Sequence, residues 1–174
     1  AAARTPTSMT ANVASAASGA DGASSGAPGA VQVRVEGRLD WRAMLQWLVA
    51  AGVIARDDAT SVAQRFGAGA SRQHPLVRLG SAGLMHARSS KPLDTELLTE
   101  WLAQRAGLPY LRIDPLKVDV GRVADVMSVR YAELRSSLPV KVTARDVTIA
   151  TSEPFDIAWV PEIESHTRRP VKIV

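Results

Sequence analysis

The chain has 174 residues, no cysteine and a formal net charge of +4 at pH 7. The lack of cysteine excludes a disulfide framework, a thiolate nucleophile and a cysteine zinc site. Basic residues are scattered and are not joined to stacking aromatics, which argues against nucleic-acid binding. The longest apolar run, from Trp47 to Ile54, is too short to cross a bilayer, so no direct membrane insertion is expected.

Residues 1–30 are almost all small or polar, with only Met9 and Val13 as sizeable apolar side chains. Such a segment buries too little apolar surface to offset the entropy of ordering it. It is not a secretory signal, because no continuous apolar stretch follows Arg4. The sequence therefore predicts a disordered tail over residues 1–30, followed by a short extended segment at 31–35.

Two helices are predicted next. Asp40 can cap a helix that begins at Trp41, and Gly52 is a plausible stop for it. Asp57 is predicted to cap a second helix, which breaks at Gly67. The first helix has one apolar face at helical spacing, made of Trp41, Met44, Leu45, Leu48 and Val49.

Between residues 73 and 91 the pattern is weaker. His74 is predicted to lie in an entry turn, and residues 79–85 form either a short helix or an irregular connection. The clearest helix runs from Asp94, its N-cap, to Arg105, and Gly107 ends it. Its predicted buried stripe is Leu97, Leu98, Trp101 and Leu102.

The remaining residues predict a small α/β unit. Residues 110–113 are extended, and 120–126 and 129–134 are short helices. A hairpin joins 138–143 to 146–151, a helix follows at 156–166 with Pro161 in its first turn or at a kink, and 170–174 form a last strand. The predicted fold class is α+β, with a helical subdomain at 31–90 and a compact α/β subdomain at 91–174. Because the chain stops inside an apolar strand, we expect it to be a segment of a longer protein.

No catalytic or metal-binding pattern is found. The three histidines, His74, His86 and His166, form neither an H-E-x-x-H helix nor a pair at ligand spacing. No G-x-S-x-G phrase supports a nucleophilic serine. We therefore predict no catalytic residue and no metal ligand.

Several phrases resemble the N-terminal domain of type II secretion ATPases, which also occurs in type IV pilus assembly ATPases. The similarity covers about residues 38–174, and the two most specific phrases are Leu108-Pro109-Tyr110 and Pro154-Phe155-Asp156. The other matching phrases are His74-Pro75-Leu76, residues 98–107, Ile113-Asp114-Pro115, Tyr131-Ala132, Leu138-Pro139-Val140 and residues 147–153.

The resemblance implies a non-catalytic docking or regulatory domain. In that family, ATP hydrolysis by a C-terminal motor drives pseudopilus assembly, and the phosphate loop G-x-x-x-x-G-K-[ST] of the motor does not occur here. ATP and magnesium would therefore belong to the motor alone. The implied partners are the motor of the parent protein and the cytoplasmic domain of the inner-membrane L-type platform protein. The domain would lie in the cytoplasm, peripheral to the inner membrane.

The apolar face of the first helix has two interpretations. It either packs against the neighbouring helices or is partly exposed to the platform protein, since Trp and Met are enriched at interfaces. Trp47 lies off the main stripe, which makes it the better candidate for an external contact. The candidate partner-binding residues are Trp41, Met44, Leu45, Trp47 and Leu48.

Some relatives of this domain bind cyclic di-GMP, which gives a second hypothesis. Their motif opens with Arg-Leu-Gly, and Arg78-Leu79-Gly80 matches this triplet, with an Arg available for phosphate. Ala87 stands where the motif needs a later Gly. Around Gly52 only the middle of a second copy matches. Arg78 is equally well explained as an ordinary surface charge.

Overall fold

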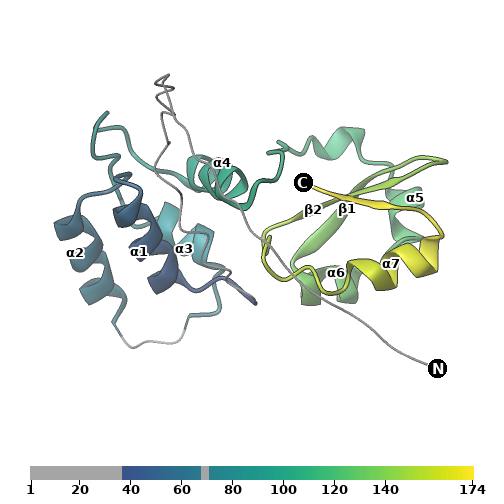
Figure 1. Ribbon diagram of the computed structural model, residues 1–174, viewed down its shortest axis with the longest axis horizontal. Helices are drawn as coiled ribbons and strands as arrows, with labels where there is room; N and C mark the ends of the chain where they lie inside the picture. The colour runs from purple at the N-terminus through teal and green to yellow at the C-terminus, as the bar shows by residue number, and fades with distance from the viewer. Residues whose placement is uncertain (1–36, 68–70) are drawn as a thin grey trace, which may run out of the picture. The chain divides into compact units, whose positions relative to one another are not determined.

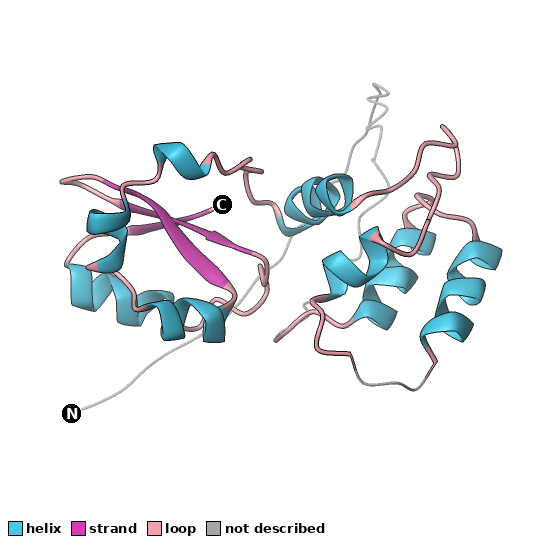
Figure 2. Cartoon of the chain, turned by 180° about the vertical axis from the view of Figure 1, so that it is seen from behind, coloured by secondary structure: helices cyan, strands magenta, loops and turns pink. Residues whose placement is uncertain are grey.

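The computed structural model describes residues 37–67 and 71–174, and all statements below refer to these residues. The predicted tail at 1–30 and the extended segment at 31–35 lie outside the described residues. The fold is α+β, as predicted, with helices first and a small sheet after them (Figures 1 and 2).

Four helices come first along the chain. The first, α1, packs against both α2 and α3, and α3 packs against α4 (Figure 1). The bounds of these helices are α1 Trp41–Ala50, α2 Arg56–Phe66, α3 Pro75–Gly80 and α4 Thr95–Ala106.

Capping residues fix where the first two helices begin. The Asp40 carboxylate accepts hydrogen bonds from the backbone N–H groups of Arg42 and Ala43, at 2.9 and 3.1 Å, so the predicted cap is confirmed. The predicted cap of α2 is wrong. Ala55 occupies that position, and Asp57 lies within the first turn, where the positive end of the helix dipole favours a carboxylate.

The segment before α4 is more ordered than predicted. His74 caps α3 through its ring Nδ1, which accepts from the backbone N–H of Leu76 at 3.3 Å, and Leu79 is fully buried. Gly80 lies directly against the start of α4, because a Cβ there would stand 2.3 Å from Thr95 Oγ1 and 2.6 Å from Thr95 N. The two helices can approach this closely only because residue 80 has no side chain.

The predicted bounds of α4 are confirmed, but its predicted buried stripe is too wide. Asp94 caps the helix by accepting from the backbone N–H of Leu97 at 2.8 Å. Leu98 and Leu102 are buried, one turn apart, whereas Leu97 is 41% exposed. Leu97 lies on the flank of the face that the other two residues present to the core.

The second half contains short helices and three strands. The hairpin and the last strand are predicted correctly, and Pro161 lies in the first turn of α7. The stretch 110–113 is irregular rather than a strand. The bounds are η1 Pro115–Lys117 (a 3₁₀ turn), α5 Val120–Ala124, α6 Val129–Arg135, β1 Ser137–Val142, β2 Val147–Thr151, α7 Val160–Thr167 and β3 Val171–Ile173.

The sheet has one buried and one open face. Its order is β1-β2-β3, with β1 antiparallel and β3 parallel to β2 (Figure 2). Val147 and Ile149 point inward, are fully buried, and pack with Trp159 of the α7 region. Because side chains alternate along a strand, Thr148 and Ala150 point to the opposite, outer face, where they are only half-buried.

Two hydrophobic cores result, one among the helices and one beneath the sheet. Leu98 and Leu102 of α4 belong to the helical core, so α4 packs on the N-terminal side of the predicted boundary at residue 90. The division into domains at 90/91 stays a prediction. No helix in the described part of the chain is long and apolar enough to span a membrane.

Candidate docking groove

An apolar groove of about 890 Å³ opens in the described part of the chain. One wall comes from α3, α4 and the segment after α4, and the other from α5, α6 and the strands β1 and β2. Its volume is near the upper end of the roughly 300–1,000 Å³ typical of ligand pockets. Among its lining residues are Leu111, Ile113, Val120, Val129, Leu138 and Ala150.

Several apolar side chains of this groove are open to solvent. Val120 and Val129, the first residues of α5 and α6, are 72% and 76% exposed, and Leu138 on β1 is 44% exposed. Isolated exposed apolar residues are ordinary, but a group that converges on one hollow marks an interaction surface. The groove can therefore bury apolar groups of another molecule without any refolding of the domain.

The outer face of the sheet forms part of the groove floor. Leu138 of β1 stands opposite Ala150 of β2, and both line the groove together with Val174. The hydrogen bond from Val174 N to Ile149 O, at 3.0 Å, extends the β2–β3 pairing to this level. The floor thus includes a cross-strand row of apolar side chains, next to a shift in the β1–β2 register between Pro139 and Lys141.

A polar cluster holds the irregular wall in place. The Tyr110 hydroxyl donates to Glu96 Oε1 of α4 at 3.2 Å, and Arg112 Nη1 lies 3.1 Å from the same oxygen. Burial, and then the nearby charge of Glu96, raise the pKa of Tyr110 above its ordinary value of 10.0. Tyr110 therefore stays neutral at physiological pH and remains a hydrogen-bond donor to Glu96.

The loop after β2 ties the sheet to the helices beside the groove. Glu153 is 3% exposed, and its Oε2 accepts from the backbone N–H of Leu39 at 2.6 Å. Its Oε1 lies 3.2 Å from His74 Nε2, and His74 also lines the groove. Phe155 in the same loop packs edge-to-face on Trp47, with ring centroids 5.8 Å apart.

Comparison with known proteins finds a family match for the part of the chain that supplies some of the groove lining. Residues 106–174, which include the irregular wall, α5, α6 and the whole sheet, match the family model of the MshEN domain. Residues 106–174 are called the MshEN segment below, after the family model that they match. The resemblance to the N-terminal domain of pilus and secretion ATPases is therefore confirmed.

The chain is also similar to individual known proteins. The chain is 40% identical over 92 residues to a type IV pilus assembly ATPase, TfpB, of Acinetobacter baylyi. That alignment covers 52% of this chain but only 16% of the relative. Among solved structures, MshE with cdg (cyclic di-GMP) aligns at 20% identity and a TM-score of 0.47, covering 79% of this chain and 89% of that one. The N-terminal domain of XpsE aligns at 17% identity and a TM-score of 0.42. This alignment covers 75% of this chain and 82% of that one.

The predicted partner face precedes the MshEN segment, and of its two interpretations the structure agrees with packing against the neighbouring helices. All five side chains are less than a tenth exposed and belong to the helical core: Trp41, Met44, Leu45, Trp47 and Leu48. Trp47, expected to face outward, is 8% exposed because Phe155 covers it and the Arg105 guanidinium lies 4.8 Å from its ring centroid.

The triplet Arg78-Leu79-Gly80, predicted as a possible cyclic di-GMP motif, has structural roles in the helices. The Arg78 guanidinium lies 4.1 Å from the Phe66 ring centroid and 5.0 Å from that of Trp41, and it donates to Phe66 O at 3.1 Å. Leu79 is fully buried, and Gly80 allows the contact with Thr95 described above. Helix packing alone is therefore sufficient to explain all three residue types.

The histidines also have local explanations. Nδ1 of His86 accepts from the backbone N–H groups of Arg88 and Ser89 in a turn, and His166 lies in the last turn of α7. Within residues 37–67 and 71–174, no group of three or more His, Cys, Asp or Glu side chains is placed to hold a metal ion. The groove beside the MshEN sheet is thus the strongest candidate site, and periodicity does not reveal it because it is assembled from separate short segments.

Proposed function

We propose that the chain is a docking and regulatory domain of a type IV pilus or type II secretion ATPase. It binds the cytoplasmic domain of the inner-membrane L-type platform protein and couples it to the motor of the parent protein. The observation that carries this proposal is the open apolar groove between the MshEN segment and the helices α3 and α4. ATP and magnesium act at the motor, and the domain lies peripheral to the inner membrane through its partner.

The groove replaces the face of α1 as the docking surface. Side chains such as Val120 and Val129 lose exposed apolar area when a partner covers them, which favours association by about 25 cal/mol per Å². The face of α1 offers no such gain, because its side chains are already buried in the domain.

Coupling to the rest of the chain is proposed to run through the Glu153 loop. His74 lines the groove and also contacts Glu153, whose other oxygen holds the backbone of Leu39. A partner seated in the groove therefore touches a residue of the network that joins the sheet to the helices. Its binding energy can favour one arrangement of this network over another.

The test is a titration of the isotope-labelled 174-residue chain with the purified cytoplasmic domain of the platform protein, followed by amide NMR. We expect saturable shifts at residues 111–113, 120, 129 and 138. Leu138→Asp should weaken binding, because it places a charge on the groove floor. Ile157→Asp is the matched control, since Ile157 is also 44% exposed but does not line the groove. Shifts confined to α2, or equal losses in both variants, would overturn the proposal.

The second candidate function is binding of cyclic di-GMP. The observation in its favour is that Arg78 is only half-buried and lies over two aromatic rings, so a cation is already positioned at the surface of α3. Titration with cyclic di-GMP should then give saturable shifts at residues 78–80 and 52–54. Arg78→Lys should lose that response, whereas Arg72→Lys should keep it. No shifts at excess nucleotide would exclude this function for the chain.

A further inference from the structure

The outer face of the sheet changes from apolar to basic within one step along the strands. Lys141 of β1 stands opposite Thr148 of β2, and Thr148 stands opposite Lys172 of β3. This cross-strand row lies directly beside the apolar row of Leu138 and Ala150. Along β2 the two rows are two residues apart, which spans about 6.6 Å, and along β1 they are three residues apart because the register shifts between Pro139 and Lys141. Both rows can therefore contact a single bound segment.

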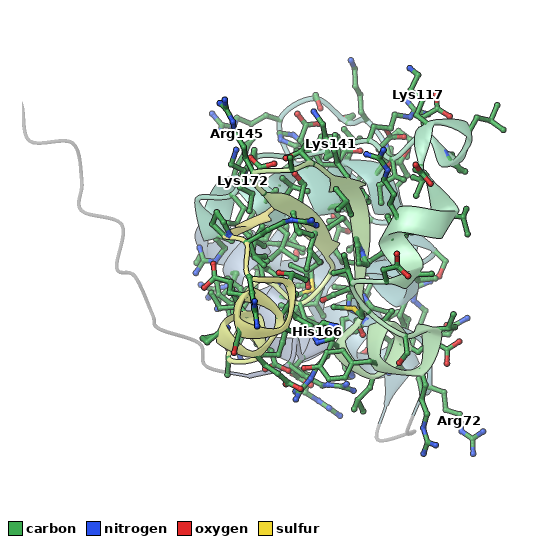
Figure 3. All side chains as sticks on the ribbon, turned by 90° about the vertical axis from the view of Figure 1, so that its right-hand side faces the viewer. Arg72, Lys117, Lys141, Arg145, His166 and Lys172 are labelled. Carbon is green, nitrogen blue, oxygen red and sulfur yellow. The ribbon has the colours of Figure 1, made fainter. Side chains whose placement is uncertain are left out.

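More cations gather on the same side. Figure 3 shows Lys117, Lys141, Arg145 and Lys172 on one side, with Arg72 well away from them. Two of the four are paired: Lys172 Nζ lies 2.5 Å from Asp146 Oδ2, and Lys117 Nζ lies 3.4 Å from Asp114 Oδ2.

The other two cations, Lys141 and Arg145, have no salt bridge within residues 37–67 and 71–174. The four cations have two carboxylate partners between them, which leaves this set of side chains with a net positive charge.

Within the described part of the chain, the groove lining is mostly apolar, with some hydroxyl side chains and no lysine or arginine. Glu133 of α6 is an exposed lining residue, and Glu96 stands behind Tyr110 on the opposite wall, paired with Arg112. His74, deeper in the wall, is paired with Glu153. None of the four cations lines the groove itself, and Lys141 and Lys172 lie beside its lining, next to the row of Leu138 and Ala150.

The geometry points to an amphipathic helix of a partner protein, with acidic side chains along one flank, as the occupant of this groove. Apolar residues at i, i+3, i+4 and i+7 would fill the groove over Leu138 and Ala150. Glu or Asp residues of the next helical row would meet Lys141 and Lys172. The inference rests on the proposed docking function and names the chemistry of the segment that docks.

An acidic flank follows from the charges present. A basic flank would face Lys141 and Arg145 at short range and would be repelled, while a neutral flank would leave these cations without partners. Surface ion pairs each contribute little affinity but add specificity and faster association. The apolar contact supplies most of the affinity, and the lysine row selects the orientation and the sign of the partner's charge.

The test uses two labelled synthetic peptides of about 18 residues, each designed as an amphipathic helix with the same leucine face. One carries Glu on the flank, and the other carries Lys at the same positions. Anisotropy titrations of the 174-residue chain should show the acidic peptide binding about tenfold more tightly. Its affinity should fall as salt rises and screens the ion pairs. Amide shifts should centre on residues 138, 141, 148 and 150.

Matched variants separate the charge from the apolar contact. The double variant Lys141→Glu/Lys172→Glu should weaken the acidic peptide about tenfold and reverse the preference between the peptides. Arg72→Glu, which also changes a surface cation, should leave both affinities unchanged. Leu138→Asp should weaken both peptides, and Ile157→Asp neither. Equal affinity of the two peptides for the parent chain, or an equal effect of Arg72→Glu, would overturn the inference.

Other occupants give different results. Vesicles with an anionic phospholipid that bind the chain through Lys141 and Lys172, while neither peptide binds, would assign the face to a lipid surface. Concentration-dependent self-association that Leu138→Asp abolishes, again without peptide binding, would assign it to a second copy. Either result overturns the inference. If the acidic peptide binds as expected but the platform domain does not, the proposed partner is wrong. The inference that the groove binds an acidic amphipathic helix is then still supported.

Discussion

The face of α1 and the groove beside the sheet are both rich in apolar side chains, yet only one of them is covered. Met44 and Leu48 on α1 are fully buried, whereas Val120 and Val129 at the groove are about three-quarters exposed. The sequence pattern marks the first surface strongly and the second hardly at all. Apolar periodicity therefore identifies a face of an element, but the tertiary structure decides whether anything covers that face.

The difference has a geometric cause. The side chains of α1 recur at helical spacing, so a single helix presents them together, and α2, α3 and α4 close over them in one core. The groove takes a few residues each from the irregular segment after α4, the short helices α5 and α6, and two strands. None of these pieces is long enough to show a periodic stripe.

The largest expected effect is a difference in stability between variants of the α1 face and variants of the groove. Leu48→Ala removes a fully buried side chain and leaves a cavity, which should lower the free energy of unfolding by about 2–5 kcal/mol. Val129→Ala, at a residue 76% exposed, should change it by less than about 0.5 kcal/mol. Urea unfolding followed by circular dichroism measures both. Similar losses in the two variants would mean that the groove is part of the core.

The next prediction concerns Gly80, where nucleotide binding and packing offer rival explanations of one residue. Gly80→Ala should destabilise the fold by about 1–3 kcal/mol, because the new Cβ would overlap the backbone of Thr95 as well as its side chain. The matched control is Gly121→Ala in α5, where the nearest atom to a Cβ is Asp119 Oδ1 at 3.5 Å. That change should be neutral or slightly stabilising, since alanine favours helix. Equal stability of the two variants would remove the packing explanation of the Arg-Leu-Gly triplet.

A smaller loss of stability is expected when Glu153, which links the two cores, is replaced. Glu153→Ala leaves the buried backbone N–H of Leu39 without its acceptor and should cost about 1–2 kcal/mol. Glu153→Gln keeps an acceptor oxygen at nearly the same position and should cost less. Hydrogen exchange at Leu39, compared between the two variants, tests the cause directly. If both variants exchange like the parent chain, this contact does not hold the cores together.

Local chemistry explains which parts of the fold the sequence could predict. Asp40, Asp94 and Gly107 act within one helical turn of their own positions, so their caps were predictable. The hairpin turn was predictable for the same reason. The ordered α3 was not, because its stability depends on Gly80 meeting Thr95, fifteen positions later. The burial of Trp47 depends likewise on Phe155, a contact that no local pattern encodes.

The smallest expected effect on stability concerns the ion pair of Lys172 and Asp146. The hydrogen bond from Lys172, followed by that from Thr143, lowers the pKa of Asp146 below its ordinary value of 3.8. Because the folded-state pKa is the lower one, the associated stability is present above 3.8 and is lost as the pH falls through the folded-state value. Lys172→Met should raise the pKa of Asp146, as carboxyl-carbon NMR would measure, and shrink this acid-dependent part of the stability. If the pKa of Asp146 does not move, Lys172 is not engaged by this carboxylate. Both lysines of the row would then be fully available to an acidic partner, and the selectivity between the acidic and basic peptides should exceed tenfold.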